Sequence, residues 1–150
     1  MKIRTSYCPA DAERVYPLLV EFGRAARLAE PFSTQEEFCA QWESLVKLRT
    51  ACTILAEEDE KVVGCLGMLF SPRVYWAGHM AAETFFWVKP SCRGSLTAAR
   101  LLREFETEAR RRGCEVVHVG HKSHFRAEEM ERFYKKFGYR SLEVMYQKDL

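Results

Sequence analysis

No apolar run in this sequence approaches the roughly 20 residues that a helix needs to span a bilayer. The first residues, Met1–Thr5, also lack the apolar stretch of a secretory signal, so we expect a cytoplasmic protein without a membrane partner. Linkers, internal repeats and low-complexity segments are absent as well. The 150 residues, 47% of them hydrophobic and 29% charged, therefore predict one domain, residues 1–150, with a packed core.

Metal and redox motifs are missing too. The six cysteines are scattered without a C-x-x-C pair or a matching histidine cluster, so we expect reduced thiols and no metal site. Cys92, next to Arg93, is the one thiol that merits a test of reactivity. A net charge of +2 is too small to indicate nucleic acid, and the basic tract Arg110–Arg112 fits the C-terminal end of a helix that stops at Gly113.

Hydrophobic periodicity predicts an α/β arrangement of strands and helices. The expected strands cover residues 2–7, 51–57, 61–70, 79–89, 114–119 and about 141–148. A helical region opens at Pro9–Asp11, a second helix spans about 33–48 from an S-x-x-E capping box at Ser33–Glu36, a third runs from about Ser95 to Arg112, and a fourth carries Met130, Phe133, Tyr134 and Phe137. Pro17 either kinks the first helix or marks the first turn of its main part.

The strand at 79–89 is rich in aromatic residues, which favours a central place in the sheet. Strict alternation puts Glu83, Phe85 and Trp87 on one face of this strand and Thr84, Phe86 and Val88 on the other. The strand-helix-strand order from 79 to 119 implies a right-handed crossover. The two strands are therefore expected to be parallel, with the helix across one face.

The junction Val88–Ala98 joins a strand end, a tight loop and a helix start, with small residues where the backbone must approach something closely. A helix N-terminus offers unpaired N–H groups and the positive end of a dipole, which suit a diphosphate, and Arg93 would add a fixed charge. The alternative is a plain strand-to-helix turn, because Gly and Ser also open helices that bind nothing.

This junction resembles the signature of the GNAT acetyltransferases, a strand ending V-x-P followed by R/Q-G-x-G-x-G/A, matched by Val88–Pro90 and Arg93–Ala98. Arg132–Tyr139 resembles the family's second signature, F-Y-x-K-x-G-F/Y. The resemblance covers essentially the whole chain and extends to small phage and bacterial members. It implies a single-domain fold with a mixed central sheet of about six to seven strands, a splayed parallel pair and four flanking helices. Leu96 replaces the middle glycine, which would weaken or reshape cofactor binding.

The resemblance also implies acetyl-CoA as co-substrate, a primary amine as acceptor, and no metal. The cofactor would lie where the parallel strands splay apart, with backbone contacts from Trp87 and Val88 and a phosphate cradle of Arg93, Gly94, Ser95, Thr97 and Ala98. Glu83, among aromatic residues that would desolvate it, is the candidate general base, and Tyr134 is the family-matched general acid. The alternatives are an exposed or ion-paired carboxylate at Glu83 and a core ring at Tyr134.

Three histidines, His118, His121 and His124, follow the cofactor helix with the spacing H-x-x-H-x-x-H. On a strand or loop, this spacing does not bring the three rings together around a metal ion. His121 or His124 could replace Glu83 as the base. The acceptor site would involve the first two helices, their connection around Leu28–Ser33, the loop Ser71–Gly78 and the last strands. These segments carry Glu30, Phe32, Tyr75 and Trp76; ordinary packing is the alternative for the aromatic residues.

Two functions are therefore carried forward. The first is an active N-acetyltransferase that works by direct attack of an amine on the thioester in a ternary complex. The second is a catalytically inactive CoA-binding or protein-interaction module, which Leu96 and the absence of a family-typical Asn near the histidines favour. A nucleic-acid-binding protein is disfavoured by the charge, and exposed edge strands favour a homodimer.

Overall fold

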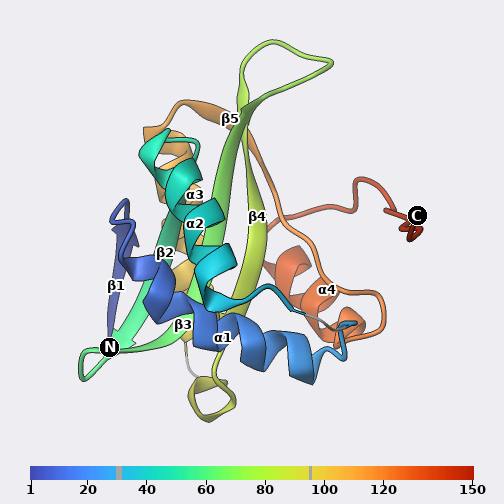
Figure 1. Ribbon diagram of the computed structural model, residues 1–150. Helices are drawn as coiled ribbons and strands as arrows, with labels where there is room; N and C mark the ends of the chain where they lie inside the picture. The colour runs from blue at the N-terminus through green and yellow to red at the C-terminus, as the bar shows by residue number, and fades with distance from the viewer. Residues whose placement is uncertain (30–31, 95) are drawn as a thin grey trace. The chain divides into compact units, whose positions relative to one another are not determined.

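The computed structural model describes residues 1–29, 32–94 and 96–150 (Figure 1). Its sheet contains β1 (Lys2–Ser6), β2 (Ala51–Glu58), β3 (Lys61–Pro72), β4 (His79–Val88) and β5 (Cys114–His118), in that spatial order. The β1–β2, β2–β3 and β3–β4 pairs are antiparallel, whereas β4 and β5 are parallel. The parallel arrangement that the strand-helix-strand order predicted is therefore confirmed.

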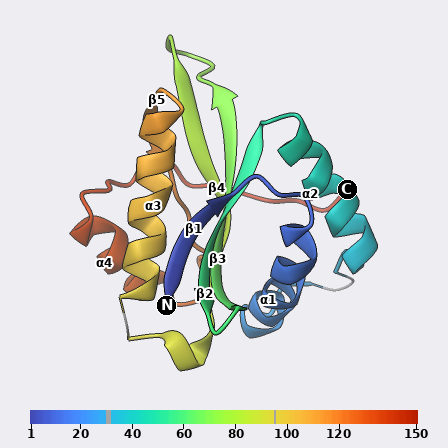
Figure 2. The ribbon, with the colours of Figure 1, turned by 90° about the vertical axis from the view of Figure 1, so that its left-hand side faces the viewer.

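The helices are α1 (Asp11–Ala25), α2 (Gln35–Lys47), α3 (Thr97–Arg111) and α4 (Ala127–Lys136), with a short 3₁₀ turn, η1, at Pro90–Cys92. Figure 2 shows α3 on one face of the sheet and the α1–α2 pair on the other. Trp42 of α2 donates its indole N–H to Thr53 of β2 over 2.9 Å, and Phe105 of α3 is fully buried. A core thus lies on each side of the sheet.

The chain forms two compact units, Met1–Gly120 and His121–Leu150. The second unit holds α4 followed by residues without regular structure, and none of residues 121–150, all of them described, pairs in a ladder. The strand expected near 141–148 and the sheet of six to seven strands are therefore wrong, because the sheet has five strands. The segment has an alternating apolar pattern, but a strand needs a hydrogen-bonded neighbour, and Val144 and Tyr146 are exposed.

Two details of the helices differ from the sequence pattern. The capping box of α2 is formed by Thr34 and Glu37, one residue beyond the expected pair Ser33 and Glu36, because each side chain bonds the other residue's backbone N–H. Helix α1 runs from Asp11 through Pro17 to Ala25, so Pro17 does not mark its first turn.

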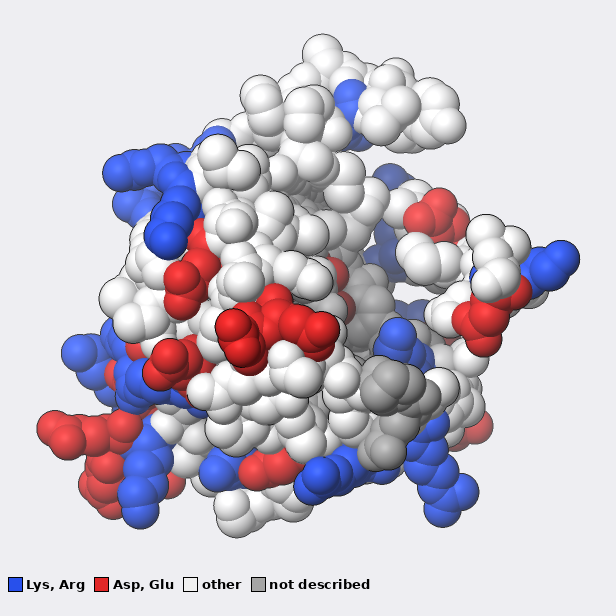
Figure 3. Space-filling view, viewed as in Figure 1, with Lys and Arg blue, Asp and Glu red and all other residues white. Residues whose placement is uncertain are grey.

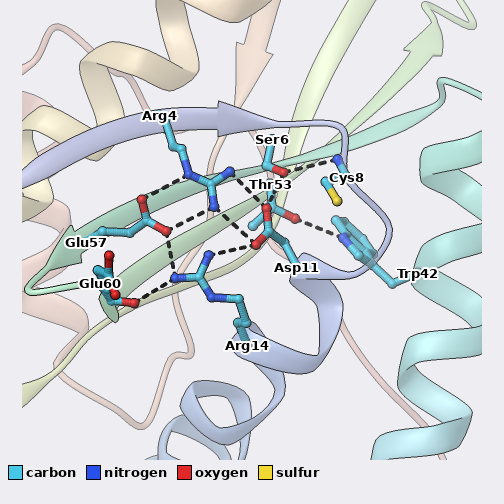
Figure 4. A network of polar contacts seen from close by, with 9 residues as sticks. All are labelled: Arg4, Ser6, Cys8, Asp11, Arg14, Trp42, Thr53, Glu57 and Glu60. Atoms are coloured by element: carbon cyan, nitrogen blue, oxygen red, sulfur yellow. Dashed lines mark hydrogen bonds and ion pairs between the residues drawn. The ribbon is translucent and has the colours of Figure 1, made fainter.

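A network of charged residues ties the start of α1 to β1 and β2 (Figure 4). Arg4 bonds both Asp11 and Glu57 over 2.9 Å, and Arg14 bridges the same two carboxylates at 2.9 and 2.8 Å. Burial by itself would raise the pKa of Asp11, but hydrogen bonds from the two arginines and Ser6 outweigh it and hold that pKa at about 2. The network fixes where α1 leaves the sheet.

Candidate functional site

The parallel pair separates halfway along β4. The register joins His79–Ala82 to Cys114–His118, and among the described residues no pairing with β5 continues over Glu83–Val88. The β5-facing backbone edge of this part of β4 therefore suits a ligand that adds to it as a strand would. The resemblance to the GNAT family implied a splayed parallel pair at this position.

A bulge interrupts β4 at the same place. Gly67 of β3 pairs with Phe85, but Met68 pairs with Glu83, so Thr84 is the extra residue. Neighbouring residues of β3 point to opposite faces, and directly paired residues share a face. Glu83 therefore lies on the opposite face from Phe85 and Trp87, and the expected alternation is wrong for Glu83.

Gly67 allows the Phe85 ring to lie directly against β3. A Cβ atom at Gly67 would be only 2.4 Å from the Phe85 ring. The ring also packs on α2, with its centroid 5.0 Å from that of Trp42. Phe85, which was expected on the same face as Glu83, thus belongs to the core under α2.

The carboxylate of Glu83 reaches across the gap between the diverging strands. Its Oε2 accepts a hydrogen bond from the backbone N–H of Gly120 over 3.1 Å, just beyond the end of β5. The residue is partly exposed. Glu83 is therefore a partly accessible carboxylate at the point where β4 and β5 part.

The loop after β4 leads to the N-terminus of α3, where the N-cap residue is Leu96. Gly94 has φ +79°, a conformation that favours glycine, and a Cβ there would meet nothing within 4 Å. Leu96 precedes α3 without a side-chain cap, and the first turn of α3 contains no acidic residue. The N–H groups of this turn and the positive end of the helix dipole are suited to an anion. The Leu96 side chain is 74% exposed.

Three of the expected cofactor residues come together at the end of β4. The Arg93 guanidinium carbon lies 4.3 Å from the centroid of the Trp87 ring, and Arg93 Nε donates to the Val88 carbonyl over 3.0 Å. Trp87 and Val88 are both buried. The Arg93 side chain thus packs back against the strand that precedes the loop.

The remaining cradle residues differ in their accessibility. Thr97 is 1% exposed, and its hydroxyl donates to Met1 Sδ at 3.0 Å, so its side chain is already engaged within the protein. Ala98 is partly exposed in the first turn of α3. Ser95 lies outside the described residues.

The other catalytic candidates lie in the second unit. Tyr134 is the buried residue of α4, and its ring has those of Phe133 and Tyr139 as neighbours, each with a centroid distance of 5.7 Å. His121 and His124 are exposed in the segment before α4. Glu83 and Tyr134 thus belong to different compact units.

The candidate acceptor residues are spread over several segments. Phe32 packs against Gly23 of α1, and Glu30 lies outside the described residues. Tyr75 and Trp76 are exposed at the tip of the β3–β4 hairpin, where Arg73 lies 5.0 Å from the Trp76 ring centroid. In Figure 3 this tip, at the top of the view, is a mostly uncharged surface.

None of the six cysteines, all of which are described, forms a disulfide, and burial raises the pKa of the Cys52 thiol to about 12. Cys92 is partly exposed.

No group of His, Cys, Asp or Glu suited to a metal ion occurs among residues 1–29, 32–94 and 96–150. Within the same residues, no helix combines the length and apolar character of a membrane span.

Two residues near the loop and the gap were missed by the sequence patterns. The first is Glu21 of α1, whose Oε2 accepts a hydrogen bond from Trp87 Nε1 over 3.3 Å, and the second is Gly120, whose backbone N–H bonds Glu83. Glu21 is next to Phe22 on an amphipathic helix and has the pattern of an ordinary polar-face residue. No local signal marks either residue, because both contacts join distant parts of the chain.

The model of the acetyltransferase (GNAT) family matches residues 12–139. No curated protein sequence matches the chain.

Three solved structures illustrate the likeness in fold. A transcriptional regulator from Bacillus halodurans C-125 has a TM-score of 0.82 at 20% identity, with 99% of each chain covered. A predicted acetyltransferase from Clostridium acetobutylicum, with acetyl-CoA, has 0.81 at 14%, with 99% of this chain and 95% of that one covered. An aminoglycoside acetyltransferase from an uncultured soil metagenomic sample, in complex with sisomicin, has 0.80 at 15%, with the same coverage.

Proposed function

The chain belongs to the acetyltransferase (GNAT) family, and from this premise we propose that it transfers an acetyl group from acetyl-CoA to a primary amine by direct attack in a ternary complex. The observation that carries the proposal is the part of β4 beyond its register with β5, Glu83–Val88. A loop follows it and ends at the N-terminus of α3, whose first turn contains no acidic residue. Acetyl-CoA has an extended pantetheine arm joined to a diphosphate. The arm suits this part of β4, and the diphosphate suits the N-terminus of α3.

In this proposal the cofactor is held mainly by backbone groups. The backbone of Trp87 and Val88 pairs with the pantetheine arm, and the N–H groups of Gly94, Ser95, Thr97 and Ala98 receive the diphosphate. Leu96 is 74% exposed, and in this proposal its side chain lies beside the diphosphate without displacing it.

The proposed chemistry needs a base and an acid. Glu83 takes a proton from the attacking ammonium or amine, the new N–C bond forms at the thioester carbonyl, and the C–S bond breaks. Tyr134 gives its hydroxyl proton to the leaving thiolate. The hydrogen bond from Gly120 orients the Glu83 carboxylate across the gap between the strands. We further propose that both units, residues 1–150, form one acyltransferase domain.

Titration calorimetry with acetyl-CoA, followed by turnover of an amine panel, tests the proposal. The panel contains aminoglycosides, small polyamines, lysine peptides and peptides with free N-termini. Micromolar cofactor binding with turnover of one class, reduced in Glu83→Gln and Tyr134→Phe without loss of cofactor affinity, is expected. Binding without turnover of any amine would favour the inactive CoA-binding module, and no binding at millimolar acetyl-CoA would overturn both functions.

A further inference from the structure

A buried indole links helix α1 to the loop after β4. One face of Trp87 carries the Arg93 guanidinium, 4.3 Å from the ring centroid, and its indole N–H bonds Glu21 Oε2 over 3.3 Å. Phe22, next to Glu21 on α1, also packs on this ring with a centroid distance of 5.5 Å. Trp87 is only 5% exposed, so its position is fixed by these neighbours.

We call the side chains of Glu21, Trp87 and Arg93 the loop clamp. In it, the indole lies between a negatively charged carboxylate and a positively charged guanidinium. A carboxylate that accepts the indole N–H polarises the ring and strengthens its attraction for the cation on its face. Arg93 Nε is bound to the Val88 carbonyl in the same arrangement. The side chain of Arg93 thus anchors the loop to the end of β4.

The loop clamp lies directly before the backbone that is proposed to hold the diphosphate. Gly94 follows Arg93 with φ +79°. It has no side chain, and a Cβ atom there would meet nothing within 4 Å, so packing by neighbouring side chains does not hold this residue in place. Two backbone hydrogen bonds of the preceding turn, from Cys92 N to Lys89 O and from Arg93 N to Pro90 O, are local. Lys89, at the start of this turn, donates its backbone N–H to the Val63 carbonyl of β3 over 2.9 Å, and its Nζ lies 3.8 Å from Glu21 Oε1. The loop clamp adds a connection through side chains from Arg93 to α1 and β4.

We propose that Glu21 is a positioning residue for the diphosphate loop, acting through Trp87 and Arg93, and that it sets the affinity for acetyl-CoA without touching the cofactor. This inference rests on the proposed cofactor site. It assigns to an acidic residue a favourable effect on the binding of a polyanion. That sign is opposite to the effect of its charge alone, since a carboxylate near a diphosphate repels it.

The sign gives the decisive test. In Glu21→Ala the charge and the hydrogen-bond acceptor are both lost, and we expect the dissociation constant of acetyl-CoA to rise roughly two- to tenfold, as for one lost hydrogen bond. In Glu21→Gln the amide oxygen can still accept from Trp87, and affinity is expected to stay near the wild-type value. Tighter binding in both variants would overturn the proposal, because only the charge would then matter.

Matched variants separate the loop clamp from general damage to α1. Glu13→Ala removes an exposed carboxylate from the same helix and is expected to leave the affinity unchanged. Trp87→Phe keeps an aromatic face but loses the indole N–H, so it should weaken binding as Glu21→Ala does. The double variant should be no weaker than the worse single one, because both break the same link. Fully additive effects would contradict the loop clamp.

Hydrogen exchange supplies a readout that needs no cofactor. Backbone amides of residues 91–94 are expected to exchange faster in Glu21→Ala than in wild type and Glu13→Ala. If wild type fails to bind acetyl-CoA, the proposed cofactor site fails, whatever the exchange shows. If wild type binds but Glu21→Ala matches it in both affinity and exchange, the cofactor site stands and the positioning role of Glu21 is refuted.

Discussion

Replacement of Ala98 by Asp is expected to stabilise α3 and to weaken acetyl-CoA binding at the same time. Ala98 is the second residue of α3, partly exposed, in a first turn that contains no acidic residue. A carboxylate there interacts favourably with the helix dipole and with the N–H groups of the first turn. The same carboxylate would occupy the position that the diphosphate is proposed to take, so stability and affinity should move in opposite directions.

The two effects can be given magnitudes. An acidic residue in the first turn of a helix contributes about 0.3–1 kcal/mol to stability. Repulsion between the Asp carboxylate and one phosphate charge roughly 6 Å away costs about 0.7 kcal/mol at the dielectric constant of water. Two phosphate charges then cost about 1.4 kcal/mol, which corresponds to about a tenfold loss of affinity. This value applies at low salt, because counterions screen the repulsion between the charges.

Titration calorimetry and urea denaturation measure both effects on the same samples. Ala98→Asn is the matched control, since it has nearly the same shape without the charge, and it should bind acetyl-CoA far better than Ala98→Asp. The difference between the two should shrink as salt is raised. If Ala98→Asp binds as tightly as Ala98→Asn at low salt, the diphosphate does not lie at the N-terminus of α3, and the reasoning is refuted.

Three further outcomes are expected. Glu83→Gln keeps an acceptor for Gly120 but cannot act as a base, so kcat/KM should fall about 100-fold or more in steady-state assays; unchanged activity would move the base role to a histidine. Gly67→Ala places a methyl group 2.4 Å from the Phe85 ring and should cost about 1–3 kcal/mol, seen as a lower urea midpoint with an unchanged slope. The pKa of Asp11, about 2 against an ordinary 3.8, contributes about 2 kcal/mol of stability at neutral pH. Because this pKa is depressed in the folded state, the contribution is complete above pH 3.8 and is lost as pH falls through about 2; Asp11→Asn should remove it, and an equal urea midpoint for the variant at pH 7 would contradict the assignment.

The sequence by itself determined the features that repeat over several residues. Apolar periodicity located the four helices and five of the six expected strands to within a few residues, and the order of elements fixed β4 and β5 as parallel. The junction Val88–Ala98 was identified because small residues and a helix start are local signals. Gly113, with φ +73°, follows α3 as the pattern indicated.

Only the tertiary structure decided which side chains meet. The bulge at Thr84 depends on the register between β3 and β4, which involves Gly67 and the size of the Phe85 ring, so alternation along β4 alone placed Glu83 on the wrong face. Glu21 and Trp87 meet although 66 positions separate them in sequence. The segment near 141–148 carries a strand pattern, but a strand forms only where another strand offers its backbone. Local patterns fix local conformation, whereas register, burial and long-range contacts depend on the assembled chain.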